Sequence, residues 1–396
     1  MQMSKKSIIS AAVVILFSSA VIGRAGAAGD VAFPQTEHTK DKDTDQTKES
    51  QKTLTVWYTG EENGQFFLDC ADGFKEETGI AVTVKEQPSL NYFKEIYDAV
   101  RDQNQALDVY LLEADDLEQA YYAQIAETIP ATDEERGLWS TQAVTASTVG
   151  ENLCAYPLYF KTCLFAYRTD YLENEPQTIQ EILDYAVEHE PGEGVEKLLE
   201  WNLSDAFYNF PFFGNAVSFQ EEEPGTVTWN WDEAKKGSAD TFFANLTALI
   251  ELDENAVSEK SVRDDFKNGT TVAVVADTDS IENLISDQTK ITTLPGLNGE
   301  IPMVPAAETT VLCVNALSED TKAAEAFAAY VSENCADRLT DQTGHMPART
   351  QACTSEVQKM ALEQYEKAIP EPDALDSDDF WVKFQNQVLQ IWNGES

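Results

Sequence analysis

"TLTVWYTGEENGQFFLDCADGFKEETGIAVTVKE", residues 53–86, predicts a strand, a helix and a second strand in that order. Its first six and last seven residues largely alternate between apolar and polar side chains and are rich in β-branched residues, as strands are. Between them, Phe66, Cys70 and Phe74 recur at every fourth position and would share one buried helix face. Gly79 is placed to end this helix. Cys70 is therefore predicted to be a small buried side chain rather than a reactive thiol.

The next segments extend the same pattern. Helical spacing runs through residues 91–103, and "DVYLL" at 108–112 is a short continuous apolar run, typical of a strand buried on both faces. Strand, helix, strand, helix and strand in this order predict a parallel sheet with right-handed crossovers. Such sheets bind ligands beyond the carboxyl ends of their strands. Those ends carry Trp57, Tyr58, Glu61, Glu113, Asp115 and Asp116.

The rest of the chain predicts further α/β structure, over a length that suits two domains. We expect residues 176–265 to be mostly helical, including "EKLLEWN" at 196–202. A closing helix at 378–394 would bury one stripe of apolar side chains, namely Phe380, Phe384, Val388 and Ile391. The other predicted elements are strands at 270–276 and 290–295, a β-rich piece at 301–317 and a helix at 320–333.

The N-terminal part of the chain is predicted to lie outside the fold. Residues 1–28 combine a basic start, an uncharged apolar run and small residues near their end, which is typical of a secretory signal peptide. An uncleaved N-terminal anchor is the alternative, although the run is short against the about 20 apolar residues of a membrane span. Residues 29–52 are polar and charged without periodicity, as in a disordered tether. We therefore expect an exported protein that is periplasmic, secreted or held at the cell surface.

Charge and residue usage exclude several classes of function. The formal net charge is -43, from 27 basic and 70 acidic side chains, so the surface would repel nucleic acid and anionic lipid. The three histidines lie far apart in the sequence, which makes a zinc site of ordinary ligand spacing improbable. Six scattered cysteines leave any disulfide pairing undetermined. We expect neither a metal nor a cofactor.

The order of these pieces resembles bacterial extracellular solute-binding proteins, the receptors of ABC importers, and most closely the maltodextrin-binding kind. The likeness runs from residue 53 to the C-terminus. The segments that carry it are "LTVWYTG" (54–60), "FKEETGIAVTV" (74–84), "LDVYLLEADDL" (107–117), "YPLYFKTCLFAYRTDYL" (156–172), "FKNGTTVAVVADTDSI" (266–281), "LPGLNGE" (294–300), "NALSEDTKAAEAFAAYV" (315–331) and "TGHMPAR" (343–349).

The resemblance implies a two-lobed α/β architecture. Each lobe would be a mostly parallel sheet flanked by helices, and hinge strands would join the lobes and let them close on a solute in the cleft. Lobe one would comprise residues 53–160 plus 304–347, and lobe two residues 161–303 plus 348–396. The implied role is a monomeric receptor that captures a small solute and delivers it to a membrane permease. We expect this solute to be a carbohydrate.

Carried over position by position, the resemblance also implies a ligand set. Its members are aromatic side chains that would stack on sugar and polar side chains that would bind hydroxyl groups. Lys161 replaces an acid of the maltodextrin binders and Asp279 replaces a tryptophan, so the ligand would differ from maltodextrin, and the lysine would pair with an anionic group on it. For each aromatic the alternative is a core position, and for each acid a solvated loop. The full set is Trp57, Tyr58, Glu61, Asp115, Lys161, Phe207, Asp279, Glu308 and Trp381.

A weaker resemblance to type I thiaminases, secreted enzymes of the same fold, gives the enzyme alternative. That family needs a cysteine nucleophile on the crossover strand and a carboxylate base. Lys161 takes the position of the nucleophile, Cys163 follows two residues later, and Asp279 matches the acid. Strand alternation puts Lys161 and Cys163 on one face. We nevertheless expect Cys163 to be packed in its strand and the protein to have no catalytic residues.

Overall fold

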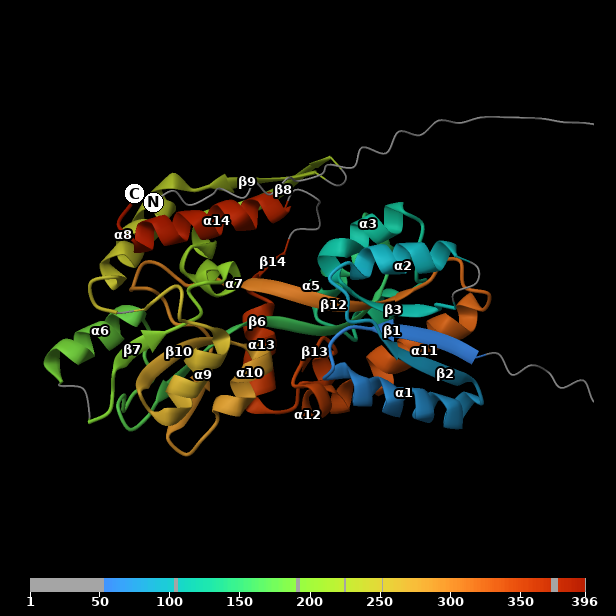
Figure 1. Cartoon of the computed structure of the whole chain (residues 1–396), viewed down its shortest axis with the longest axis horizontal. Coiled ribbons are helices and arrows are strands. Elements are labelled where there is room, and N and C mark those ends of the chain that lie inside the picture. The colour runs from blue at the N-terminus through green and yellow to red at the C-terminus, as the bar shows by residue number, and fades with distance from the viewer. Residues whose placement is uncertain are drawn as a thin grey trace, which may run out of the picture. The chain divides into compact units, whose positions relative to one another are not determined.

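The computed structural model describes residues 53–102, 106–189, 193–223, 226–250, 252–371 and 377–395 (Figure 1). The predicted signal peptide and tether, at 1–52, lie outside the described residues. In this part of the chain one 10-stranded sheet has the main order β2-β1-β3-β12-β6-β10-β7, with β11, β13 and β14 paired at its side.

The N-terminal segment folds as its sequence predicts. Gly79 adopts φ 77° and ends the first helix with a hydrogen bond from its N–H to the carbonyl oxygen of Lys75. The first strand pairs in parallel with both of the strands that follow it. The elements are β1 (Thr53–Tyr58), α1 (Asn63–Thr78), β2 (Ala81–Glu86), α2 (Tyr92–Arg101) and β3 (Val109–Glu113).

One long strand, β6 (Tyr156–Arg168), belongs to both lobes. Its first half pairs with β12 (Ala306–Val314) as far as Thr162, and its second half pairs with β10 (Thr271–Asp277) from Cys163 onward. Both pairings are antiparallel, and so is the pairing of β12 with β3, so the sheet is mixed rather than parallel throughout. In Figure 1, β6 and β12 run from the lobe of β1–β3 to the lobe of β10. The two-lobed α/β fold is confirmed, while the lobe boundaries stay a prediction.

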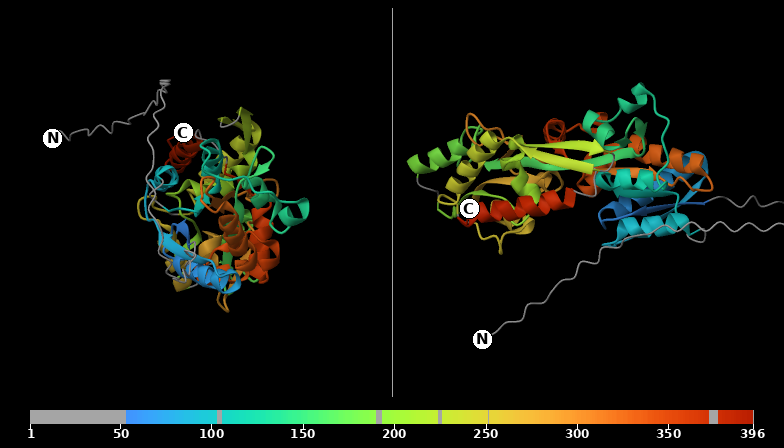
Figure 2. Two further views of the ribbon diagram at one scale, coloured as in Figure 1. Left: turned by 90° about the vertical axis from the view of Figure 1, so that its right-hand side faces the viewer. Right: turned by 90° about the horizontal axis from the view of Figure 1, so that it is seen from above.

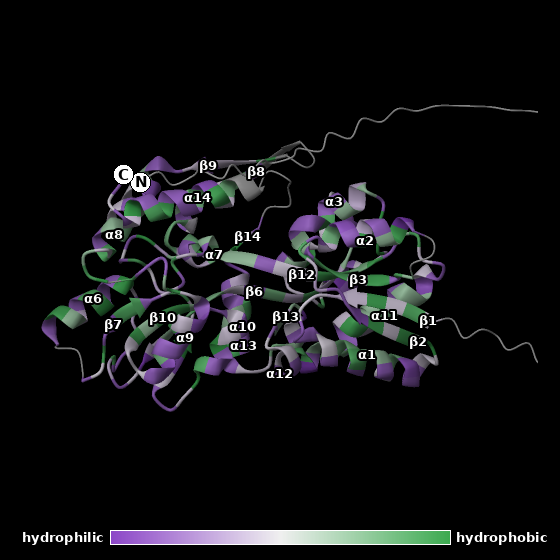
Figure 3. Ribbon diagram, in the orientation of Figure 1, coloured by the Kyte–Doolittle hydropathy of each residue, from purple (hydrophilic) through white to green (hydrophobic). Residues whose placement is uncertain are grey.

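Helices cover both faces of the first-lobe sheet. On β1, Leu54 and Val56 pack into one hydrophobic cluster with α1, whereas Trp57 packs into another with α2. This division follows from strand geometry, because successive side chains point to opposite faces. Figure 3 shows apolar residues concentrated on the strands, while the covering helices carry mixed faces.

Two predictions for the second lobe are wrong. "EKLLEWN" holds a strand, β7 (Lys197–Glu200), instead of a helix, because it pairs in parallel with β10 and buries Leu199. The mostly helical region also contains an antiparallel hairpin of β8 (Val217–Glu223) and β9 (Thr226–Trp231). Pairing with a distant strand thus decides the structure of a four-residue segment whose own propensity is ambiguous.

The closing helix, α14 (Ser377–Trp392), buries the stripe that its spacing predicts. Phe380, Phe384, Val388 and Ile391 are all buried in the second-lobe core. Phe380 and Phe384 stack at 5.7 Å between ring centroids, and the ring of Trp231 from the hairpin lies 6.4 Å from that of Phe384. Figures 1 and 2 show α14 and the hairpin side by side.

The remaining elements are short or lie at the periphery of the sheet. Among the described residues, no helix has both the length and the apolar character needed to cross a membrane. These elements are α3 (Leu117–Tyr122), α4 (Asp133–Arg136), α5 (Thr141–Ala146), β4 (Thr148–Val149), β5 (Asn152–Leu153), α6 (Ile179–Glu188), α7 (Ala206–Asn209), α8 (Glu233–Leu246), α9 (Glu259–Asn268), α10 (Thr278–Ile281), β11 (Thr289–Thr292), α11 (Thr321–Asn334), α12 (Leu339–Thr343), β13 (Met346–Pro347), α13 (Glu356–Tyr365) and β14 (Ile369–Pro370).

Candidate functional site

Lys161 is the centre of a polar site where β6 passes between the lobes. It lies opposite Glu308 in the β6–β12 register, and its Nζ is 3.0 Å from Glu308 Oε2. The same ammonium lies 4.3 Å from the centroid of the Phe207 ring, a cation–π contact. Asp205 caps α7 by accepting a hydrogen bond from the Phe207 N–H at 3.0 Å, which fixes the position of that ring. The side chains of Lys161 and Glu308 keep 28% and 30% of their surface exposed, so solvent reaches the pair.

An acidic pocket adjoins this pair. Its cavity volume is ≈70 Å³, and its wall is formed by the end of β3, by β12 and by the residues that follow β14. The sheet brings these three segments together, because β12 pairs with both β3 and β14. Four of the nine residues that line the pocket are acidic, namely Glu113, Asp115, Glu308 and Glu371. Hereafter we call this cavity the acidic pocket.

The crowding of carboxyl groups dominates the electrostatics of the acidic pocket. Burial, helped by repulsion from Glu308, raises the pKa of Glu113 to about 8, although a hydrogen bond from Thr310 Oγ1 at 2.9 Å opposes the shift. The Glu113 side chain lines the pocket and is exposed to solvent. Burial also raises the pKa of Glu371 well above its usual value, and neighbouring carboxylates add to the shift.

The pKa values of Lys161 and Glu308, the two partners of the central ion pair, are both raised. Burial would lower the pKa of Lys161, but Glu308 and other nearby carboxylates outweigh it, so the net shift is upward and the lysine stays charged. Burial raises the pKa of Glu308 even though Lys161 acts against the shift. An ordinary isolated pair would lower the carboxyl pKa. One lysine here faces several carboxylates, and it cannot compensate all of them.

Cys163 lies in the core beneath the site. It is fully buried in the second-lobe cluster and pairs with Asp277 across β6 and β10. Burial, followed by the charge of Asp277, raises the pKa of its thiol well above the usual value, so the thiolate is disfavoured. The Asp277 carboxylate accepts hydrogen bonds from the Tyr208 hydroxyl and, at 2.7 Å, from the Ser280 N–H.

His345 connects the two lobes beside the site. Its ring stacks on Tyr159 of β6 at 4.0 Å between centroids. Its Nδ1 lies 3.0 Å from Asp279 Oδ1 in α10, and its Nε2 lies 3.7 Å from Glu62 Oε1 in the loop after β1. Burial would lower the pKa of His345, but the two carboxylates, with a smaller effect from Glu113, raise it above its usual value.

A family model described as bacterial extracellular solute-binding protein matches residues 69–364, which is more than half of the chain. The chain belongs to this family. Solved structures with the same fold include the extracellular solute-binding protein from Staphylococcus aureus in complex with maltose, at 19% identity and a TM-score of 0.73 over 86% of this chain and 93% of that one.

Two further structures agree on the fold of this solute-binding protein. The Thermus thermophilus maltotriose binding protein, bound with maltotriose, is 20% identical with a TM-score of 0.66 over 86% of this chain and 94% of that one. The maltose-binding periplasmic protein from Listeria monocytogenes, in complex with maltose, is 17% identical with a TM-score of 0.70 over 87% of this chain and 94% of that one.

The solute-binding protein brings five of the nine predicted ligand residues into one neighbourhood. Lys161, Glu308 and Phe207 are in direct contact. Asp115 lines the acidic pocket together with Glu308, and the Asp279 carboxylate helps to hold the pKa of Lys161 up. The proposed anionic partner of Lys161 in the ligand is not needed to balance the lysine, because Glu308 already pairs with it.

The other four predicted residues have different recorded contacts. Trp57 is 1% exposed, and Lys85 places its ammonium 4.5 Å from the Trp57 ring. Tyr58 is buried against α1, and Trp381 packs on the second-lobe aromatic cluster. Glu61 is exposed in the loop after β1. Their roles toward a ligand stay predictions. Trp57 and Tyr58 are buried as the core alternative has it, whereas Trp381 is partly buried.

Sequence reasoning did not assign three residues of the site, each for a different reason. Glu113 stands at the end of a predicted strand, which is a signal for a ligand position, but the resemblance does not include it in the ligand set. His345 stands in one of the family-like segments and is one of only three histidines. Glu371 follows β14, a two-residue strand whose pairing with β12 has no local sequence signal.

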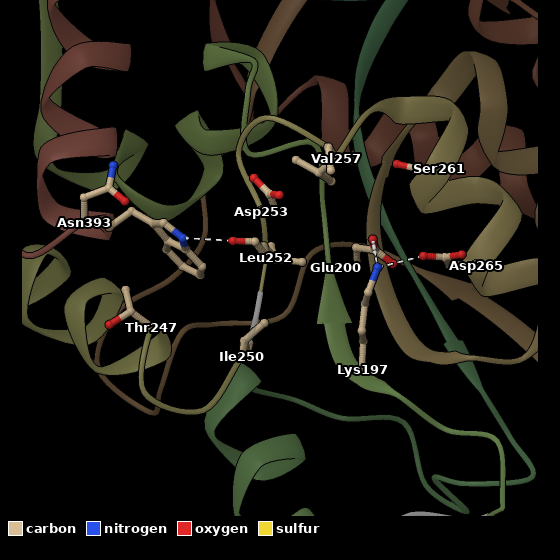
Figure 4. Close-up of a pocket in the computed structure, with 12 residues that line it drawn as sticks. Lys197, Glu200, Thr247, Ile250, Leu252, Asp253, Val257, Ser261, Asp265 and Asn393 are labelled. Carbon is tan, nitrogen blue, oxygen red and sulfur yellow. Dashed lines mark hydrogen bonds and ion pairs between the residues drawn. The ribbon is translucent and has the colours of Figure 1, made fainter.

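A larger cavity, with a volume of ≈620 Å³, lies in the second lobe and shares no lining residue with the acidic pocket (Figure 4). Three of its four charged groups are paired with one another. Lys197 Nζ contacts Glu200 Oε1 at 2.5 Å and Asp265 Oδ2 at 2.7 Å, and Glu200 Oε2 accepts a hydrogen bond from Thr271 Oγ1 at 2.8 Å. Asp253, which also lines this cavity, accepts hydrogen bonds from Asn255. Although this cavity is larger, we place the candidate site at Lys161, because five predicted ligand residues gather there and β6 passes between the lobes at that point.

Proposed function

We propose that this protein is an exported receptor that binds a small carbohydrate at the Lys161 site and delivers it to an ABC importer. The observation that carries the proposal is the contact of Lys161 with Glu308 and Phe207 where β6 joins the lobes. Membership of the extracellular solute-binding family supports it, and so do fold relatives that bind maltose or maltotriose. Closure of the lobes around the solute, a monomeric state and the permease partner are parts of the same proposal.

The polar groups of the site suit hydroxyl recognition. The Lys161 ammonium can donate to a sugar oxygen while it keeps its contact with Glu308, and the Glu308 carboxylate can accept from a sugar hydroxyl. The Lys161 ammonium lies over the Phe207 ring, so we assign Phe207 mainly the task of holding the lysine. Few placed polar groups beside apolar area are typical of small-ligand sites.

Catalysis is not part of the proposal. The enzyme alternative needs a reactive thiolate on β6, whereas Cys163 is fully buried and its pKa is raised by burial. A nucleophile has to be accessible and activated by a neighbouring base. The burial of Cys163 and the raised pKa of its thiol both argue that it is a packing residue.

Thermal unfolding against a panel of maltose, maltotriose, peptides, spermidine and thiamin tests the proposal. A ligand at ~100 times its Kd adds about 2.7 kcal/mol of stability. We expect a saccharide to raise the unfolding temperature and to be recovered unaltered. If thiamin alone stabilised the protein, or were consumed, the receptor proposal would be wrong and the enzyme alternative would replace it.

A Cys163→Ala variant is the control for this experiment. We expect it to bind the saccharide as the wild type does, because the thiol has no path to the ligand. Loss of binding in a folded Cys163→Ala variant would contradict the assignment of this residue to the core.

A further inference from the structure

Two cysteines that are far apart in the sequence meet beside one arginine. Cys70 lies within α1, and Cys335 follows the last residue of α11. Arg338 Nη2 lies 3.0 Å from Cys335 Sγ and 4.0 Å from Cys70 Sγ, and the two thiols share a hydrogen bond. Both cysteine side chains are fully buried in the same hydrophobic cluster.

The packing of α1 on α11 holds the two cysteines together. The ring of Phe74, one turn after Cys70, lies 5.3 Å from that of Phe327 and 5.5 Å from that of Tyr330 between centroids. A Cβ at Gly73 would come within 2.5 Å of the Tyr330 hydroxyl, so glycine permits a close approach of the two helices at this point. A disulfide requires close approach of its two backbones, because its Cα atoms lie only about 4.4–6.8 Å apart.

The surroundings of the pair favour a thiolate on Cys335 and a thiol on Cys70. The hydrogen bond from Cys70 lowers the pKa of the Cys335 thiol, and Arg338 adds to this shift, although burial opposes it. Burial, together with the hydrogen bond to Cys335, raises the pKa of Cys70. A neighbouring guanidinium is one of the groups that make a cysteine nucleophilic. Cys335 is therefore the thiol of the pair that is prepared for exchange.

We infer that Cys70 and Cys335 form a disulfide bond in the exported protein, and that this bond ties α1 to the end of α11. The chain belongs to an extracellular family, and disulfides form and persist in oxidising compartments outside the cytoplasm. Among the described residues, no other pair of thiols shares a hydrogen bond. The inference uses the export that belongs to the proposed function, but it does not depend on the ligand.

The bond forms in two exchange steps with an oxidant of the disulfide class, such as oxidised glutathione or a thiol oxidoreductase. The Cys335 thiolate attacks one sulfur of the oxidant, which forms a mixed disulfide and releases the first thiolate of the oxidant. Cys70 then loses its proton and its sulfur attacks Cys335 Sγ, which releases the second thiolate. The two cysteines together lose two electrons and two protons, and the oxidant becomes two thiols. Because both sulfurs are buried in the folded protein, the exchange takes place while the chain folds.

The test is mass spectrometry of the full chain, expressed with its own N-terminal segment and collected after export. Free thiols are alkylated in denaturant without reductant, and the protein is then cut with trypsin. Cys70 is the only cysteine of the tryptic peptide 53–75, and Cys335 is the only one of the peptide 323–338. We expect these two peptides to be linked and to separate on reduction. Alkylation of both peptides before reduction, or linkage of either to a different cysteine, would overturn the inference.

Two variants and a control locate the bond through its effect on stability. The bond constrains a long loop of the unfolded chain, so wild type refolded and kept in reductant should unfold several degrees below the bridged wild type. Cys70→Ala and Cys335→Ala should each abolish this difference, so a folding defect in one variant does not decide the test. Cys353→Ala is the matched control, because that buried thiol donates to the Pro347 carbonyl oxygen. It should keep the linked peptides and the response to reductant, whereas a wild type without this response would contradict the inference.

The outcomes separate this inference from the proposed function. Exported protein that binds maltotriose with both thiols free would overturn the disulfide and leave the receptor in place. Linked peptides in a protein that binds no saccharide would support the disulfide and overturn the carbohydrate receptor. A full chain that stayed in the cytoplasm would overturn the export on which both depend.

Discussion

Lys161 and Lys197 both lie beside carboxylates, but only Lys161 belongs to the candidate binding site. Lys161 lies on β6 where it passes between the lobes, and Lys197 lies on β7 in the second lobe. Lys197 contacts two carboxylates, and the second oxygen of Glu200 is taken by Thr271, so each group of that network has a partner. Lys161 contacts one carboxylate directly, and the nearby carboxylates of Asp277 and Asp279 also help to raise its pKa.

The difference teaches that cavity size alone does not mark the candidate site. The cavity beside Lys197 is ≈620 Å³, against ≈70 Å³ for the acidic pocket. A fully paired network gains nothing from a charged ligand, because the ligand would have to break existing contacts. In the acidic pocket, burial and neighbouring acids raise the pKa of Glu113 and Glu371 instead.

The largest effect expected is the destabilisation of a Lys197→Met variant. Removing the ammonium leaves Glu200, which is 1% exposed, without its ionic partner, and breaking a buried pair costs about 3 kcal/mol. Urea unfolding measures the loss, and ligand affinity should not change. The control is Lys94→Met, which removes an exposed helix pair with Asp98 and should cost less than about 0.5 kcal/mol. A loss as small as that of the control would show that the Lys197 network is not a structural one.

Lys161→Met should show the opposite pattern. We expect affinity for a neutral saccharide to fall about tenfold or more, because a charged donor is lost. Stability should fall by less than about 1 kcal/mol, since both partners of the pair are partly exposed. Calorimetric titration of both variants compares the sites, and unchanged affinity in Lys161→Met would remove Lys161 from the ligand set.

Glu113→Gln tests the raised pKa through the pH dependence of stability. Since the pKa of Glu113 rises from 4.5 to about 8 on folding, its favourable contribution is complete below pH 4.5 and is lost as the pH rises through 8. Glutamine cannot ionise, so the variant does not lose this contribution. The unfolding temperature of the variant minus that of the wild type should therefore increase from pH 5 to pH 9. A difference that stays constant over this range would show that Glu113 titrates normally.

The smallest effect is expected for His345→Gln. The pKa of His345 is raised from 6.5, so the contribution of its charged form is present below that pH and is lost as the pH rises through the folded-state value. The variant should be less stable than the wild type at pH 5.5, by at most about 1 kcal/mol, and the deficit should shrink by pH 9. A deficit that grew with pH would contradict the contacts of His345 with Asp279 and Glu62.

Local periodicity was enough to predict β1, α1, β2, α2 and β3 and the closing helix, because their signal lies in neighbouring residues. β7 was missed because four residues carry too little pattern, and pairing with β10 decides their structure. The resemblance placed Lys161 and Glu308 in the ligand set, but only the β6–β12 register shows that they face each other. Glu371 required knowledge of how β14 pairs, which no local pattern contains.

The position of β12 also has a consequence for the order in which the chain folds. This strand lies between β3 and β6, although it follows both by a long stretch of sequence. A nascent chain cannot complete the first-lobe sheet, or form the acidic pocket, before residues 306–314 have been synthesised. Contacts so distant in sequence also slow folding. Late completion of the sheet would keep the chain unfolded during synthesis, a state suited to passage across a membrane before the receptor becomes able to bind.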